Sequence, residues 1–97
     1  MYKLSLLATE DFAAIYEYSF LHFGAEQADS YTNDLEKVFT LLFQSPFMGS
    51  ICTDIGSDIY VHYHGRHSIY YQQRSTDIFV LRILHGSMEP SFHKFEI

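Results

Sequence analysis

The chain has 97 residues, a formal net charge of −6, 47% hydrophobic residues and 18% aromatic residues. This length predicts a single domain, residues 1–97, with enough apolar side chains to fill a core. The charge argues against non-specific nucleic-acid binding, which depends on neutralising phosphates, and no window approaches the roughly 18–20 apolar residues of a membrane span.

The first half of the chain predicts a short strand and two helices. Residues 2–7 alternate in polarity as a strand does, and Thr9 is the expected N-cap of the first helix. Gly24 is expected to end that helix and Pro46 to stop the second, which runs from about Ala25 to Phe43. The tight link at Gly24 predicts a helical hairpin. The first helix has a continuous face formed by Phe12, Ile15, Tyr16, Ser19, Phe20 and Phe23.

The second half predicts a loop over residues 44–58 and then three strands. Ile59–His64 alternates in polarity, residues 68–73 are rich in β-branched and aromatic side chains, and Ile78–His85 is apolar except for Arg82. The last strand is therefore expected inside a sheet, with both faces covered. The order β-α-α-β-β-β predicts an α+β fold with helices on one side of a small, mostly antiparallel sheet.

Possible catalytic and metal-binding groups are few. His62 and His64 share one strand face, but no Cys, Asp or Glu stands at the spacing a zinc site needs, so we expect no metal site. Cys52 is expected to be a small packed residue. The chain has no glycine-rich phosphate loop, so no cofactor is expected. A single cysteine and the lack of a signal-like N-terminus favour a cytoplasmic protein.

The arginines of the second half could in principle support metal-free RNA cleavage. Arg66 and Arg74 are expected in turns at opposite ends of one strand, so they should not converge. Arg82 lies in an apolar strand, and two interpretations of it are about equally supported. Its guanidinium could pair with a carboxylate from the helices, or it could line a functional groove.

Several short motifs, in this order and at this spacing, are similar to those of one protein family. They are Leu4-Ser5 with Ala8, Asp11 and Ile15, Phe23-Gly24 with Gln27-Ala28 and Tyr31, Ser45-Pro46 with Met48-Gly49, Gly65 with His67-Ser68-Ile69-Tyr70-Tyr71, and Arg82-Ile83-Leu84-His85 with Met88. With these motifs the chain resembles the ParE toxins of ParDE type II toxin–antitoxin modules, part of the RelE/ParE superfamily. The resemblance covers nearly the whole length.

The resemblance implies a helical hairpin packed on a small antiparallel sheet. It also implies a ParD-like antitoxin as partner and DNA gyrase as target, inhibited by binding and not by catalysis. We expect no membrane partner and no direct sequence-specific contact with nucleic acid. On this basis the target-binding edge is expected at Arg82, His85 and Met88. The antitoxin is expected in the groove between helices and sheet, with aromatic anchors at Phe20, Tyr31 and Phe39.

Two alternatives stay open. RelE-like relatives cleave mRNA on the ribosome with basic residues and a C-terminal Tyr, but this chain has no Tyr after Tyr71. The other alternative is a non-toxic module that only binds the antitoxin. It is suggested by Ser50, where many family members have Arg, and by the lack of a basic residue near Tyr60.

Overall fold

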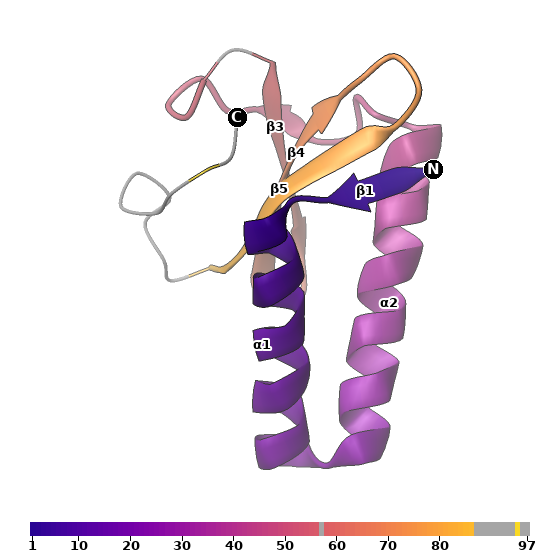
Figure 1. Cartoon of the computed structure of the whole chain (residues 1–97), viewed down its shortest axis with the longest axis vertical. Helices are drawn as coiled ribbons and strands as arrows, with labels where there is room; N and C mark the ends of the chain where they lie inside the picture. Colours follow the sequence, from indigo (N-terminus) through magenta and orange to yellow (C-terminus); the bar gives the residue numbers. More distant parts are fainter. Residues whose placement is uncertain (57, 87–94, 96–97) are drawn as a thin grey trace.

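The computed structural model describes residues 1–56, 58–86 and 95 and has two layers (Figure 1). One layer is a hairpin of two long helices, α1 (Leu6–Phe23) and α2 (Ala25–Gln44). The other is a five-stranded sheet. Its strands are β1 (Tyr2–Leu4), β2 (Ser50–Ile51), β3 (Ile59–His64), β4 (His67–Gln73) and β5 (Ile78–His85). The α+β fold expected from the sequence is confirmed.

The sheet has the order β1-β5-β4-β3-β2. Only β1 and β5 pair in parallel, and the other pairs are antiparallel. β5 therefore lies between two strands, as its apolar sequence predicted. The expected loop over residues 44–58 was partly wrong, because Ser50 and Ile51 pair with Val61 and Tyr60 at the sheet edge. Two residues give too little periodicity to be recognised in a sequence.

Apolar side chains cover both faces of β5. The core between the hairpin and the sheet contains Ile78, Val80 and Ile83, and it includes Phe39 of α2. A second core on the opposite face contains Leu81 and Leu84, and the partly buried Phe95 packs against it. A strand between two cores has no solvated face, which explains its nearly continuous apolar sequence.

A β-bulge interrupts the pairing of β5 with β4. Tyr70 lies opposite Arg82 and Tyr71 lies opposite Val80, so the register passes over Leu81. An extra residue of this kind leaves backbone groups outside the ladder. The Leu81 carbonyl instead accepts a hydrogen bond of 2.7 Å from the Ser5 hydroxyl.

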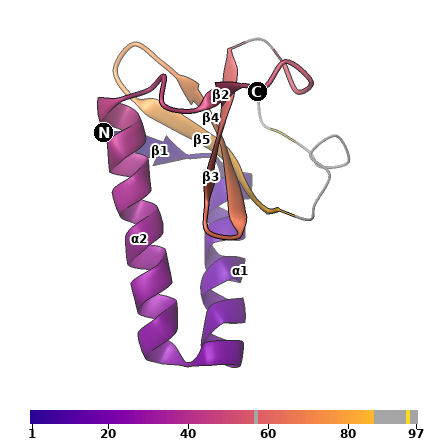
Figure 2. The ribbon, with the colours of Figure 1, turned by 180° about the vertical axis from the view of Figure 1, so that it is seen from behind.

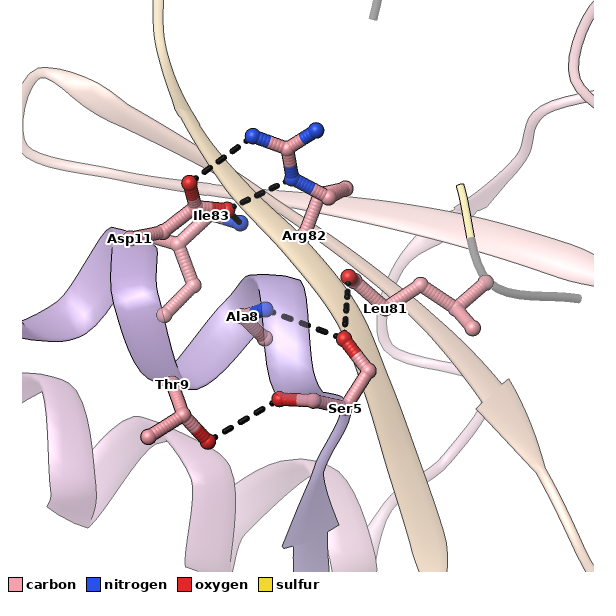
Figure 3. Close-up of polar contacts among 7 residues, drawn as sticks. All are labelled: Ser5, Ala8, Thr9, Asp11, Leu81, Arg82 and Ile83. Carbon is pink, nitrogen blue, oxygen red and sulfur yellow. Dashed lines mark hydrogen bonds and ion pairs between the residues drawn. The ribbon is translucent and has the colours of Figure 1, made fainter. Parts of the chain in front are cut away.

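The first helix begins at Leu6 and not after Thr9, so the expected N-cap was wrong. Ser5 is the N-cap, because its Oγ accepts a 3.0 Å hydrogen bond from the Ala8 backbone N–H (Figure 3). The Thr9 hydroxyl lies within the helix and donates to the Ser5 carbonyl at 2.9 Å. The expected strand over residues 2–7 is correspondingly shorter and ends at Leu4. Both Ser5 and Thr9 are residue types that cap helices, and the hydrogen bond that distinguishes Ser5 goes to Leu81, which is distant in the sequence.

The hairpin extends well beyond the end of the sheet (Figures 1 and 2). Along the predicted apolar face of α1, Ile15 and Ser19 are buried, whereas Phe20 is 48% exposed and Phe23 is 62% exposed. The regular face of the sequence therefore continues past the part of the sheet that could cover it. Gly24, with a φ of 92°, forms the link between the helices as expected.

We expect Ser5→Ala to lower the free energy of unfolding by about 1–2 kcal/mol. The substitution removes the helix cap and the hydrogen bond to the Leu81 carbonyl together. Urea denaturation followed by circular dichroism would measure the loss. Thr9→Ala is the matched control and should cost less than about 0.5 kcal/mol. An equal loss in the two variants would contradict the assignment of Ser5 as the cap.

Candidate functional site: a groove between the helices and the β3–β4 turn

A groove of about 710 Å³ lies between the helical hairpin and the end of the sheet. The view from behind shows the β3–β4 turn descending beside α1 (Figure 2). We call this the hairpin groove. Its lining residues are Asp11, Ala14, Ile15, Tyr18, Ser19 and Phe23 of α1, Gln27 and Tyr31 of α2, Gly65, Arg66 and His67 around the turn, and Arg82, Ile83 and His85 of β5.

An ion pair joins α1 to β5 in one wall of the groove. Arg82 donates from Nε to Asp11 Oδ2 at 2.7 Å and from Nη2 to Oδ1 at 2.8 Å (Figure 3). The Ile83 backbone N–H also donates to Asp11 Oδ2 at 3.0 Å. The two charged side chains are only 12% and 15% exposed. The bidentate geometry satisfies both charges, so a helix carboxylate neutralises Arg82, and Arg82 lines the groove as well.

A cluster of ring side chains also lines the groove. The Tyr31 hydroxyl lies 2.6 Å from His67 Nδ1, and the His67 and His85 rings meet edge to face with centroids 5.7 Å apart. Gly65, with a φ of 57°, forms the turn above Tyr31. A Cβ atom at Gly65 would lie 2.9 Å from the Tyr31 hydroxyl, so both the backbone and the space require glycine there.

Burial shapes the titration of this cluster. Burial lowers the pKa of His67, the neighbouring His85 and His64 lower it further, and Asp11 acts in the opposite direction. Burial also raises the pKa of Tyr31, against a smaller opposite effect of Arg66. The His67 imidazole and the Tyr31 phenol are therefore both favoured in their neutral forms.

The structure brings three of the expected site residues into the hairpin groove. Arg82 and His85 come from β5 and Tyr31 comes from α2. Phe20 is exposed on α1 outside the groove, where its ring stacks on Tyr16 at 6.4 Å. Met88 lies outside the described residues.

Phe39 is a correction to the expected set of anchors. Its side chain is 0% exposed and packs in the core against Tyr2 and Phe12. Helical spacing placed it on the apolar face of α2, but β1 covers that part of the face. A partner has no access to it in this structure, so Phe39 contributes to stability and not to a surface.

Sequence reasoning about the site overlooked Asp11, Arg66 and His67. In the sequence, Asp11 stood out only as one residue of the motifs similar to those of the family. Arg66 and Arg74 do lie at opposite ends of β4, as expected, but Arg66 shares the groove with Arg82. That proximity depends on how the β3–β4 turn packs beside α1, which spacing along the chain does not specify.

In the described part of the chain, no three His, Cys, Asp or Glu side chains are arranged to hold a metal ion. His62 is partly buried, and this burial lowers its pKa, with a further contribution from His64. Neither of the two helices has the length and apolar character to cross a membrane.

Comparison with known proteins decides the family. The model of the family described as the ParE toxin of the type II toxin–antitoxin system parDE matches residues 2–90. The chain belongs to the ParE toxin family. The matched range contains every residue that lines the hairpin groove.

The chain is also similar to one curated protein and one solved structure. Toxin ParE1 of Caulobacter vibrioides is 28% identical over 92 residues, which are 95% of each chain. A solved chain of the chromosomal ParDE system from P. aeruginosa superposes with a TM-score of 0.72 at 21% identity, covering 87% of this chain and 92% of that one. The second likeness supports the ParE-like fold.

We expect Asp11→Ala to lower the free energy of unfolding by about 2–4 kcal/mol, because it removes the carboxylate that neutralises the mostly buried Arg82. Arg82→Met should cost less, since Asp11 would still accept the Ile83 N–H. The double variant Asp11→Ala with Arg82→Met should be more stable than the sum of the two losses implies. Urea denaturation of all three variants measures the coupling, and strict additivity would contradict it.

The lowered pKa of His67 predicts a pH dependence of stability. The unfolded state takes up a proton near the ordinary pKa of 6.5, whereas the folded state resists protonation. The free energy of unfolding should therefore fall as the pH is lowered from about 7.5 to about 5.5. His67→Gln should remove part of this slope in denaturant titrations at several pH values. The exposed His22 provides the control, and a His22→Gln variant that flattens the slope equally would refute the assignment.

Proposed function

We propose that the chain inhibits growth by binding DNA gyrase and that a ParD-like antitoxin holds it inactive. The observation that carries this proposal is the family match over residues 2–90, which includes both helices, all five strands and the hairpin groove. Inhibition by binding needs an accessible surface and no reactive group. Gyrase works in the cytoplasm, which is where we expect the chain to act.

The hairpin groove is the proposed antitoxin site. Its volume of about 710 Å³ is within the range of ligand-binding clefts, and apolar side chains form much of its lining. An amphipathic helix laid into such a groove is a common mode of peptide recognition. Tyr31 is an anchor in the wall of the groove, and the exposed Phe20 offers a second aromatic contact on α1.

The proposed target-binding edge is the end of β5. His85 is exposed there and would contact the target directly, together with Met88 in the following segment. Arg82 is held by Asp11, so we assign it the role of positioning β5 against α1. In this proposal His85 contacts the target, whereas Arg82 holds β5, and with it His85, in position.

Expression of the chain alone should arrest growth, and co-expression with the product of the adjacent reading frame should restore it. The purified chain should inhibit supercoiling by gyrase. His85→Ala should raise the concentration needed for half-maximal inhibition, whereas His22→Ala, a matched change outside the groove, should not. Unaffected growth and unaffected supercoiling would refute the toxin proposal. Tight antitoxin binding without any growth effect would support the non-toxic module instead.

One observation favours RelE-like mRNA cleavage as a second candidate. Tyr31, His67 and His85 lie around one groove that also contains Arg66, and these residue types serve in acid–base and phosphate chemistry. The engagement of Arg82 by Asp11 counts against it, because that guanidinium is occupied. Ribosome-dependent cleavage of mRNA by the purified chain would establish this activity, and His85→Ala and Arg82→Ala should then abolish it.

A further inference from the structure

The hairpin groove has a different charge from the rest of the chain. The formal net charge of the chain is −6, yet the charged and basic side chains that line the groove are Arg66, Arg82, His67 and His85, with Asp11 as the one acid among the described lining residues. Both Asp11 oxygens already accept hydrogen bonds from Arg82. The groove is therefore lined mainly by basic residue types within an acidic protein.

Arg66 is the cation of the groove that remains available. Its residue is exposed, and no carboxylate in the described part of the chain lies within ion-pair distance of it. Its backbone is fixed, because the Arg66 carbonyl accepts a 2.7 Å hydrogen bond from the Gly86 N–H. The preceding Gly65 packs directly on Tyr31. A charged side chain on a well-defined turn at the edge of an apolar groove is suited to selecting a partner.

The apolar residues of the lining indicate which kind of surface a bound partner would present to the groove. Ala14, Ile15, Tyr18 and Phe23 of α1 give the groove a long apolar side, and Ile83 closes it from the sheet. An occupant with one apolar face and an acid beside it would satisfy both the apolar wall and Arg66. A phosphate group fits less well, because Arg82 is neutralised and His67 is favoured in its neutral form.

We infer that Arg66 determines specificity in the hairpin groove by pairing with a carboxylate on an amphipathic segment of the antitoxin. The inference rests on the proposed function, since it assumes an antitoxin in this groove. It adds the chemistry of recognition: apolar residues at helical spacing enter the groove, and an Asp or Glu beside them reaches the β3–β4 turn. Such a rim charge controls the association rate and the choice of partner more than the total affinity.

The test measures the dissociation constant between the full chain and the protein encoded by the adjacent reading frame. Arg66→Gln should weaken binding by about three- to tenfold, and Arg66→Glu by about thirtyfold or more, because it places like charges together. Lys37→Glu is the matched control, since it makes the same change in net charge at an exposed position of α2 outside the groove. It should change the dissociation constant by less than about twofold. Arg66→Gln should also reduce the dependence of binding on salt.

A charge exchange identifies the partner residue. Each Asp and Glu of the antitoxin is changed singly to Lys, and one of these variants should restore binding to Arg66→Glu. Circular dichroism and thermal unfolding would check that the Arg66 variants are folded. We expect that they are, because Arg66 is exposed.

Separate results refute the inference and the proposed function. If the unmodified chain does not bind the antitoxin, the proposed function fails. If it binds and Arg66→Glu binds equally well, only the role of Arg66 is overturned. The role is also overturned if Arg66→Glu leaves antitoxin binding intact but disrupts a homodimer of the free chain or its binding to a short RNA oligonucleotide.

Discussion

The junction between the start of α1 and the bulge of β5 is the constraint on which this fold depends. Ser5 caps the helix and bonds to the Leu81 carbonyl, and two turns later Asp11 binds Arg82 and the Ile83 N–H (Figure 3). The contacts from Ser5 and Asp11 to β5 join residues more than 70 positions apart in the sequence. The bulge supplies the carbonyl outside the ladder, and the helix supplies the carboxylate that an arginine in an apolar strand requires. These hydrogen bonds and the ion pair fix the orientation of α1 on the sheet.

The same junction leaves the far half of the hairpin without a sheet beneath it. The helices are 18 and 20 residues long, whereas the longest strand has only 8 residues. A helix rises about 1.5 Å per residue and a strand about 3.3 Å, so the helices are slightly longer in space as well. Because they are anchored at one end of the sheet, they project past its other end. Phe23 in the hairpin groove and Phe20 outside it then remain exposed, where a partner is able to cover them.

Within the groove, charges are divided between stability and recognition. Arg82 is enclosed and neutralised by Asp11, so it holds the wall in place. Arg66 stands on an exposed turn without a carboxylate nearby in the described residues. His67 and Tyr31 line the same groove, and burial favours their neutral forms. The groove thus keeps most of its ionisable groups uncharged or paired and offers a defined point of positive charge to a partner.

The sequence by itself determined the α+β class, the two helices and four of the five strands in their order, and it indicated the family by resemblance. Helical spacing, glycine and proline positions and the apolar run of Ile78–His85 are local signals, and each specifies its own element. The sequence left two interpretations of Arg82 open, placed the first cap at Thr9 and took Phe39 for a surface anchor. Only the tertiary structure decided these points, because each depends on contact with a distant segment: Asp11 accepts from Arg82, Leu81 accepts from Ser5, and β1 with α1 covers Phe39. Periodicity shows which face of a helix is apolar, but only packing shows how much of that face is covered.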